Sequence, residues 1–321
     1  MEQIPFDPHI RAINIRKDLP SIADLIELSF SDHMDDEGRD YLRHIRLIAR
    51  SLGGYLVDGN SLETSQFPFH GYLWVEDNRV IGNLTLIPVH RLAPGNYFIA
   101  NVAVHPDHRG RGIARQLTNR AIAHVRQHEG KQIFLQVRDD NPTAIHIYQQ
   151  TGFEELTRRS SWIAANSRRF HQPGNGITVA RRRKTDWEQQ QLWLREIYPD
   201  SISWNLPFSA KRLAPGLLTQ VNNLLNGSMT SSLSAYEHHR LIGNATFESG
   251  FAVNDYIWLA TSPVWEDSMI TTLVPRLLTR ALKPNKVLVN YPAGRGVKAF
   301  EFCGMQLLHT LIWMRLPISS F

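Results

Sequence analysis

The stretch NVAVHPDHRGRGIARQL, residues 101–117, carries the strongest structural signal in this chain. An apolar run ends at Pro106, a loop with two arginines and two glycines follows, and apolar residues then recur at every fourth position. This pattern predicts a strand that leads through a glycine-rich loop into an amphipathic helix. Glycines let a ligand approach the backbone closely, and unpaired N–H groups at a helix start favour anions. Because Arg109 and Arg111 add positive charge, the loop is predicted to bind phosphate.

Two common phosphate-binding loops do not fit this sequence. The P-loop ends in Lys followed by Ser or Thr, and no such pair follows Gly112. The dinucleotide-binding fingerprint needs a small residue where Arg115 stands, because a long side chain there would crowd the helix against the strand. The pattern that remains is Arg109-x-x-Gly112-x-Ala114.

This remaining pattern resembles the coenzyme A loop of the GNAT acetyltransferase superfamily, (Q/R)xxGx(G/A), and the preceding VAVHPDHRG is similar to that family's fourth strand and its exit. A second segment, NPTAIHIYQQTGF at residues 141–153, resembles the family's N…A…xYxxxGF motif. The two motifs stand in the family's order and at its spacing, which is a more specific signal than either motif alone. The resemblance covers about residues 13–163.

The hydrophobic pattern of the first half agrees with the family's element order of strand, helix, helix, three strands, helix, strand, helix, strand. The expected strands are 13–15, 71–76, 80–90, 97–104, 132–137 and 154–164, and the expected helices begin near Asp18 and cover 41–52, 112–128 and 142–150. The resemblance implies an α+β fold in which helices flank a mixed, mostly antiparallel twisted sheet.

The second half of the chain repeats the pattern of the first. Residues 79–85, RVIGNLT, recur as RLIGNAT at 240–246, and four further pairs of segments keep the same order. Duplication explains such ordered similarity. We therefore predict two tandem GNAT-like domains, residues 1–165 and 166–321, with a polar linker at about 165–176.

Only the first domain is expected to be active. In the second copy the loop residues align with EDSM at 266–269, which brings two acidic residues and no glycine, and Phe300 aligns with Tyr148. Acidic side chains repel a pyrophosphate, and side chains in place of glycine block its approach. The second domain is thus predicted to be a degenerate GNAT-like fold that packs, shapes the acceptor pocket or mediates assembly.

The resemblance also implies which residues of the first domain hold acetyl-CoA. Residues of the fourth strand would leave the neighbouring strand at a bulge, pair with the pantetheine arm and direct N–H groups to the developing oxyanion. Main-chain N–H groups of the loop would bind the pyrophosphate, and Asn141 would contact the pantetheine or other polar parts of the cofactor. Tyr148 stands where the family places the general acid for the leaving thiolate, in contact with the cofactor. The strand and loop residues meant here are Val102, Ala103 and Val104, and Arg109, Gly110, Arg111, Gly112, Ile113 and Ala114.

The general base stays open at this point. Many relatives carry Glu on the fourth strand, a few residues before the VAV, but Ala100 and Asn101 stand there and neither can accept a proton. Four alternatives remain: an ordered water chain, Glu76, His90, and the acidic segment DHMDDE at 32–37. That segment is expected in the loop between the first two helices, where it could attract a cationic amine.

The composition is that of an ordinary globular protein, with 42% hydrophobic and 20% charged residues among 321 and a net charge of +5. No apolar stretch reaches the ~18 residues that span a bilayer, and the N-terminus lacks a secretion signal, so we expect a cytoplasmic protein with no membrane partner. The single Cys303 excludes an intrachain disulfide. The short basic run at 181–184 is interpreted as a solvated turn and not as a nucleic-acid site. No metal is expected, because His105 and His108 lack a third ligand.

The sequence thus predicts a GNAT-type N-acyltransferase that moves an acetyl group from acetyl-CoA to a primary amine by direct attack in a ternary complex. The acceptor is expected to be a small molecule or a peptide. Two other hypotheses stay open: a non-catalytic acyl-CoA-binding sensor or scaffold, which the missing glutamate suggests, and a Rossmann-like dinucleotide enzyme, which Arg115 opposes. The identity of the acceptor, the acyl-chain length and the oligomeric state are open, and an oligomer is compatible with the sequence.

Overall fold

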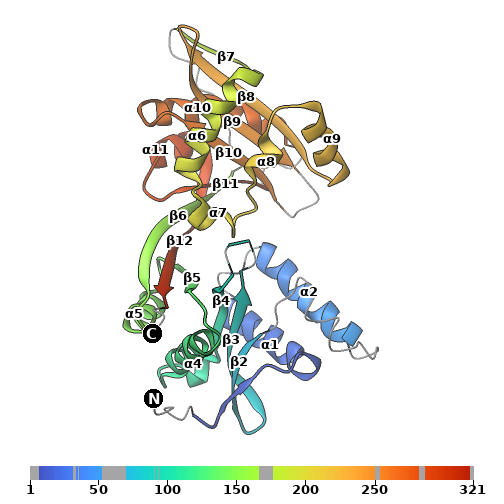
Figure 1. Ribbon diagram of the computed structural model, residues 1–321, viewed down its shortest axis with the longest axis vertical. Coiled ribbons are helices and arrows are strands. Elements are labelled where there is room, and N and C mark those ends of the chain that lie inside the picture. Colours follow the sequence, from blue (N-terminus) through green and yellow to red (C-terminus); the bar gives the residue numbers. More distant parts are fainter. Residues whose placement is uncertain are drawn as a thin grey trace. The chain divides into compact units, whose positions relative to one another are not determined.

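The computed structural model describes residues 7–31, 34, 36–52, 70–89, 91–92, 94–165, 176–249, 254–281 and 286–318. The chain forms two compact units (Figure 1). Unit 1 consists of Met1–Leu156 together with Ile312–Phe321, and unit 2 consists of Thr157–Leu311. In each unit, helices accompany a β-sheet.

The sheet of unit 1 is mixed and mostly antiparallel. β1 (Ile10–Ala12), β2 (Gly71–Glu76), β3 (Arg79–Pro88) and β4 (Asn96–Val104) pair antiparallel in that order, and β5 (Gln132–Arg138) pairs with β4 in parallel. The next strand in order is β12 (Met305–Pro317), whose residues from Ile312 onward belong to unit 1. The predicted β2–β3 hairpin is confirmed, because residues 77–78 form its turn with φ of 47° and 60°, a conformation that suits Asp and Asn.

Helices cover both faces of this sheet. α4 (Ile113–Gln127) and α5 (Pro142–Gln150) contribute to one apolar cluster, and α1 (Ile15–Phe30) and α2 (Asp36–Leu52) contribute to another. Along β2, Tyr72 and Trp74 belong to the first cluster and Leu73 to the second, as expected for a strand whose side chains alternate between faces. The apolar residues that recur at every fourth position of α4 are buried, as predicted, and form one stripe along the helix: Ile113, Leu117, Ala121 and Val125.

The start of α1 differs from the sequence expectation. The strand expected at 13–15 lies at Ile10–Ala12, and the helix begins three residues before Asp18. The cause is the cap residue Asn14, whose side chain accepts a hydrogen bond from the N–H of Arg16. Asp18 lies inside the first turn, where its buried carboxylate accepts from the N–H of Asn14 at 2.7 Å and from the guanidinium of Arg11 at 2.6 and 2.8 Å.

Unit 2 has a similar architecture. Its strands follow one another in the order β6, β11, β10, β9, β8, β7, and only β10 and β11 pair in parallel. The strands are β6 (Glu154–Ala164), β7 (Ile177–Arg181), β8 (Met229–Glu237), β9 (Arg240–Ser249), β10 (Asp255–Thr261) and β11 (Val287–Pro292). The helices are α6 (Trp187–Ile197), α7 (Asp200–Ser203), α8 (Ala210–Leu213), α9 (Leu217–Leu225), α10 (Glu266–Leu278) and α11 (Val297–Phe302), with short 3₁₀ turns at Lys184–Asp186 and Pro263–Trp265.

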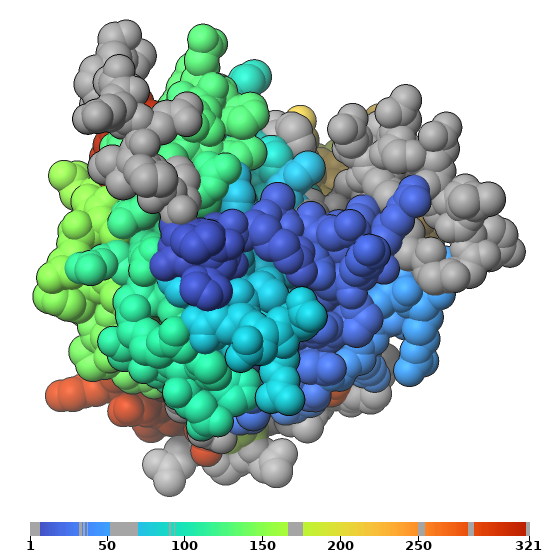
Figure 2. All heavy atoms as spheres, turned by 90° about the horizontal axis from the view of Figure 1, so that it is seen from below, coloured from blue at the N-terminus to red at the C-terminus, as the bar shows by residue number. Residues whose placement is uncertain are grey.

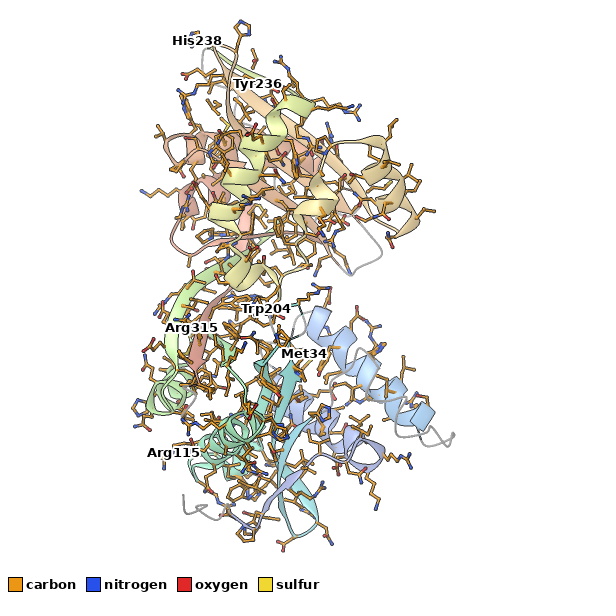
Figure 3. The ribbon with its side chains drawn as sticks, viewed as in Figure 1. Met34, Arg115, Trp204, Tyr236, His238 and Arg315 are labelled. Atoms are coloured by element: carbon orange, nitrogen blue, oxygen red, sulfur yellow. The ribbon has the colours of Figure 1, made fainter. Side chains whose placement is uncertain are left out.

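Local features recur at equivalent places in the two units. Gly82 in β3 lies against α4, where a Cβ would come within 2.8 Å of Ile113 Cγ2, and Gly243 in β9 lies against α10, where a Cβ would come within 2.5 Å of Met269 Cγ. The β8–β9 turn at residues 238–239, with His238 labelled in Figure 3, has φ of 44° and 70°, as in the β2–β3 turn. The repeated RxIGNxT segment therefore has the same structural task in both units, since its glycine lets a helix approach the sheet.

The compact units do not coincide with the predicted halves, residues 1–165 and 166–321. β6 begins in unit 1 and continues into unit 2, and β12 begins in unit 2 and ends in unit 1. Ile312, Met314 and Leu316 of β12 lie in the same apolar core as α4. The end of the chain therefore completes the core of unit 1.

Candidate functional site

The predicted phosphate loop follows β4 and lies at the start of α4. A 3₁₀ turn at Pro106–His108 leads into Gly110 and Gly112, whose φ values of 78° and 77° are left-handed. A Cβ at either glycine would meet no heavy atom within 4 Å, so the glycines serve the backbone conformation and leave the space above it open. Gly112 is the N-cap of α4, and no side chain caps the helix there. The first N–H groups of α4 are therefore available to an anion.

The two arginines of the loop are held differently. Arg111 donates to both carboxylate oxygens of Glu76, at 2.6 and 3.0 Å, and to His108 Nδ1 at 2.7 Å. Among the described residues, Arg109 donates to two carbonyl oxygens, those of Val104 at 3.3 Å and Ser29 at 3.5 Å. The sequence did not predict that a carboxylate neutralises Arg111. Arg109 is the loop arginine whose charge is balanced by no ion pair among the described residues.

The same ion pair makes Glu76 a poor general base. Hydrogen bonds from Arg111 and from Trp74 Nε1 lower the pKa of Glu76 to about 2. A carboxylate with so low a pKa holds a proton weakly at neutral pH. Of the other candidates, His90 lies outside the described residues, as do Asp32, His33 and Asp35 of the acidic segment, in which Asp36 pairs with Arg39. In Figure 2, the residues around β1, in dark blue, lie beside the cyan residues of β2, the strand with which β1 pairs.

β4 separates from β5 beside the loop. The two strands pair from Asn96–Gln132 to Ile99–Leu135, although β4 continues to Val104 and β5 to Arg138. The separation starts at a bulge, because the register with β3 shifts there and Asn101 has a left-handed φ of 52°. The expected bulge is therefore present, and the segment Val102, Ala103 and Val104 lies directly after it.

Three neutral polar groups meet at this bulge, the place where the resemblance implies a glutamate. Asn83 is fully buried and donates from Nδ2 to the carbonyl of Asn101 at 2.7 Å, and Asn101 donates from Nδ2 to the hydroxyl of Tyr41 at 2.8 Å. Burial raises the pKa of Tyr41, so its hydroxyl stays protonated at neutral pH. Oδ1 of Asn83 has no hydrogen-bond partner among the described residues. The sequence did not single out Tyr41, and Asn83 stood out only as a member of the repeated segment 79–85 and not as a candidate site residue.

Tyr148 is buried in α5. Its ring packs edge-on against Phe153, with centroids 5.9 Å apart. Burial raises the pKa of Tyr148 well above its usual value, so the phenol keeps its proton through the neutral range. The phenol therefore carries the proton that a general acid would donate, although the same rise in pKa makes it a weaker acid than free tyrosine. Asn141 also has a structural task, because its Oδ1 caps α5 by accepting from the N–H of Ala144 at 3.0 Å.

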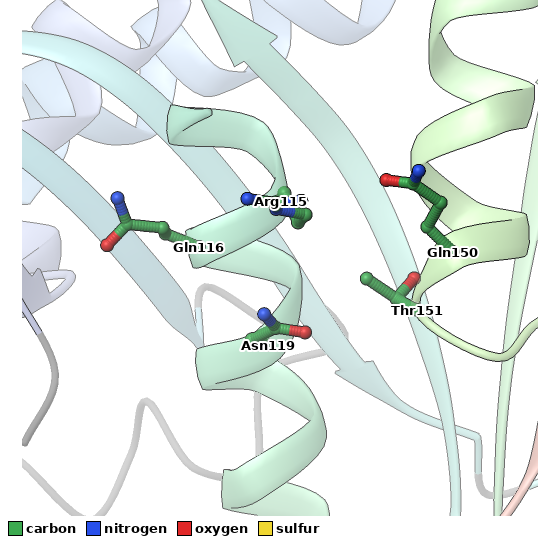
Figure 4. A pocket seen from close by; sticks show the side chains of 5 residues that line it. All are labelled: Arg115, Gln116, Asn119, Gln150 and Thr151. Carbon is green, nitrogen blue, oxygen red and sulfur yellow. The ribbon is translucent and has the colours of Figure 1, made fainter. Parts of the chain in front are cut away.

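An open pocket of about 610 Å³ lies between α4 and the end of α5. Arg115, Gln116 and Asn119 line it from α4, and Gln150 and Thr151 line it from the other side (Figure 4). Arg115 is exposed on α4 (Figure 3), so it does not press against the strand. The pocket thus borders the helix whose first turn closes the phosphate loop.

The equivalent region of unit 2 is built differently. α10 begins directly at Glu266, whose buried carboxylate accepts from the hydroxyl of Tyr291 at 3.0 Å and pairs with Arg295. β10 and β11 pair at only two positions. Beyond them, the hydroxyl of Tyr198 accepts from the N–H of Leu259 at 3.3 Å. Side chains of unit 2 therefore occupy the positions that the backbone leaves open in unit 1.

The described residues include His, Asp and Glu side chains, one cysteine, and helices of up to 17 residues. Among them, no group of three or more His, Cys, Asp or Glu side chains could hold a metal ion. Nor is any helix of the described parts long and apolar enough to cross a membrane. Cys303 is buried, and burial raises the pKa of its thiol to about 12.

Comparison with known proteins assigns the first part of the chain to a family. Residues 25–153 match the family model described as "Acetyltransferase (GNAT) family". The spermidine N(1)-acetyltransferase of Vibrio cholerae is 34% identical over 87 residues, which are 25% of this chain and 47% of that protein. The N-alpha-acetyltransferase RimI of Mycobacterium tuberculosis is 30% identical over 80 residues, 25% of this chain and 49% of that protein. The chain thus spans about half the length of these two relatives.

Solved structures show the same fold over nearly the whole chain. A GCN5-related N-acetyltransferase from Sphaerobacter thermophilus covers 98% of both chains with a TM-score of 0.60 and 16% identity. A tandem GNAT protein from the clavulanic acid biosynthesis pathway covers 97% of this chain and 99% of its own, with a TM-score of 0.53 and 12% identity. The predicted fold class, a mixed and mostly antiparallel sheet with helices in two GNAT-like parts, is confirmed. Residues 25–153 therefore form a GNAT acetyltransferase domain, and the chain as a whole has the fold of these GNAT structures.

Proposed function

We propose that the protein is an acetyl-CoA-dependent N-acetyltransferase whose active site lies in unit 1. The observation that carries this proposal is the glycine loop at the uncapped start of α4, beside the strand that leaves its neighbour at Asn101. Two matched relatives bear names of enzymes that acetylate a polyamine and an α-amino group. A primary amine, on a small molecule or on a peptide, is therefore the acceptor class that we propose.

The loop and the strand would each bind a different part of the cofactor. Main-chain N–H groups from Arg109 to Ala114 bind the pyrophosphate, since Gly110 and Gly112 leave the approach free of side chains. The segment Val102 to Val104 binds the pantetheine arm through its backbone, because β5 no longer pairs with it there. Asn141 contributes its Nδ2, as its Oδ1 is used by the helix cap.

Direct attack of the amine on the thioester requires two proton movements. The new C–N bond forms as the C–S bond breaks, the amine loses a proton, and the thiolate gains one. Tyr148 is the proposed donor to the sulfur, because its phenol keeps its proton at neutral pH. For the amine we propose a water-mediated route past Asn83, Asn101 and Tyr41. Asn83 Oδ1 is a buried acceptor without a partner among the described residues, and the Tyr41 hydroxyl is a donor.

We propose a structural task for unit 2. Glu266 occupies the start of α10 with its carboxylate, and this negative charge would oppose a pyrophosphate. Tyr198 already uses the N–H of Leu259, which is on the strand that corresponds to β4. One acetyl-CoA per chain is therefore expected.

Calorimetric titration of the whole chain with acetyl-CoA tests the proposed acetyl-CoA site in unit 1 and the proposal that unit 2 has none. A stoichiometry of one per chain, followed by turnover with a panel that includes spermidine and short peptides, would support the proposal. Two sites per chain would contradict the assignment of unit 2, and a lack of binding would contradict the whole proposal.

We keep a second hypothesis, an acyl-CoA-binding sensor or scaffold, because β4 has no glutamate near the bulge. Neither Ala100 nor Asn101 is a base, and Glu76 is held by Arg111. Tight binding of acetyl-CoA without turnover of any amine in the panel would favour this alternative.

A further inference from the structure

α9, in unit 2, directs its apolar side chains outward. The five apolar residues of the helix and Met229 shortly after it are between 55% and 88% exposed: Leu217, Leu218, Val221, Leu224, Leu225 and Met229. The buried residue of the helix is polar, since Asn223 is 2% exposed and donates from Nδ2 to the carbonyl of Arg212 at 2.7 Å. A surface helix normally buries its apolar face, so the orientation of α9 is inverted. Figure 1 shows α9 beside α8 and β8 within unit 2.

The size of this α9 patch suits the centre of a protein interface. At about 30 Å² for each methyl or methylene group, its exposed side chains offer roughly 500 Å² of apolar surface. The largest patch on a typical monomer covers about 300–600 Å² and is often functional. A standard interface buries about 800 Å² on each partner, with an apolar centre and a polar rim. The α9 patch supplies such a centre.

The charge around α9 favours a second copy of the same chain. α9 and the residues that follow it to 236 contain no charged side chain, and of the two cations that precede it on α8, Lys211 and Arg212, the second is paired with Glu248. In a two-fold interface a surface faces itself, so a charge of one sign would face its own copy and repel it. The absence of Lys and Arg also disfavours a lipid surface, because membrane-bound helices usually carry these residues on their polar face.

The sequence of α9 is symmetric about its middle. LLTQVNNLL, residues 217–225, has the same apolar and polar pattern in both directions from Val221. Two such helices can therefore pack antiparallel, with Val221 near the axis and the leucine pairs of one end against those of the other. Small residues at the crossing point let helix axes approach to 8–10 Å.

We propose that the protein forms a two-fold dimer through α9, with the α9 of a second copy seated antiparallel on it. The axis passes near Val221, and the apolar patch of each copy is covered by the other. This inference does not depend on the proposed acetyl transfer, because it rests on the surface of unit 2 alone.

Sedimentation of the whole chain tests the dimer. The wild type is expected at twice the mass of the 36.8 kDa chain, and Leu218→Glu is expected to raise the dimer dissociation constant at least 100-fold. Val264→Glu is the matched control, because Val264 is also 88% exposed in unit 2 but lies outside α9. It should leave the dimer intact. A monomeric wild type, or equal dissociation of both variants, would overturn the proposal.

Cross-linking provides a second measurement that does not rely on disruption. With helix axes 8–10 Å apart and a Cα radius of about 2.3 Å, facing Cα atoms lie about 4–5 Å apart, which a disulfide can span. Val221→Cys should therefore give a covalent dimer under a mild oxidant, since the native Cys303 is buried. Val264→Cys should not. Failure of Val221→Cys to cross-link, or sedimentation of the wild type only with phosphatidylcholine–phosphatidylserine vesicles, would show a different occupant of α9.

Discussion

At the scale of single residues, the motifs could be predicted but their partners could not. The sequence predicts the loop glycines and the bulged strand because their signals lie within seventeen contiguous residues, 101–117. From the sequence alone, Asn101 can also be recognised as a residue that cannot accept a proton, at the place where the resemblance implies a glutamate. Its partners Asn83 and Tyr41 lie on β3 and α2, and only packing brings them to the bulge. The same holds for Glu76, whose pairing with Arg111 removes it as a base.

Tyr148→Phe is expected to lower kcat by about 100-fold or more with little change in the affinity for acetyl-CoA. The reason is that phenylalanine keeps the packing against Phe153 and removes only the proton donor. Steady-state kinetics together with calorimetry measure the two effects separately. Tyr97→Phe is the control, because Tyr97 is on β4 of the same unit and lies outside both motifs, residues 101–117 and 141–153. An unchanged kcat in Tyr148→Phe would remove this residue as the acid.

Arg109→Glu is expected to weaken acetyl-CoA binding by at least tenfold, or about 1.4 kcal/mol. The change reverses a charge beside the predicted pyrophosphate site, where Arg109 donates to the carbonyl oxygens of Val104 and Ser29. Arg126→Glu alters the net charge equally at the far, exposed end of α4 and should leave the affinity unchanged. Equal affinity in all three proteins, measured by calorimetry, would contradict the loop assignment.

At the scale of elements, the hydrophobic periodicity predicted the bounds of a helix that packs along its whole length. It did not predict the start of a helix that is set by a capping side chain. α4 spans Ile113–Gln127 against an expected 112–128, because its apolar stripe is long and regular. β1 and the start of α1 are displaced by three residues, since the side chain of Asn14 starts the helix before the apolar period becomes visible. The repeated glycine of β3 and β9 is an element-scale feature of a different kind, because it controls how closely a helix packs on a sheet.

Gly82→Ala is expected to destabilise the protein by about 1–3 kcal/mol, the usual cost of overpacking. The new Cβ would lie 2.8 Å from Ile113 Cγ2, on a β-branched side chain with one strongly preferred rotamer in a helix, and 3.0 Å from Trp74 Cβ, which moves only with its backbone. Gly243→Ala should cost less, because the flexible side chain of Met269 can give way. Urea unfolding of the two variants measures the difference, and a larger cost at Gly243 would show that this packing argument is wrong.

At the scale of the whole molecule, the repeat predicted two similar parts but not how the chain is shared between them. Each half carries its own final strand pattern, and nothing in that pattern tells which sheet the strand joins. Ile312, Met314 and Leu316 nevertheless lie in the core of unit 1. The assignment of an active part and a degenerate part remains a prediction, now supported by Glu266 and Tyr198 in unit 2.

Met314→Ala is expected to lower the free energy of unfolding by about 2–5 kcal/mol and to weaken acetyl-CoA binding, although it lies close to the end of the chain. Met314 is 1% exposed in the core that also holds α4. Leu307→Ala, on the same strand but 53% exposed, should have little effect on either quantity. Urea unfolding and calorimetry test both variants. If Met314→Ala behaves like the control, the last strand does not support unit 1.

The place of the last strand also has a consequence for synthesis on the ribosome. The polypeptide reaches Leu156 early, but the residues that complete that core emerge only after all of Thr157–Leu311 has been made. At roughly 5–20 residues per second, the delay is on the order of ten seconds or more. During that time the nascent first unit exposes the apolar groove that Ile312, Met314 and Leu316 later fill, which makes it a substrate for ribosome-associated chaperones.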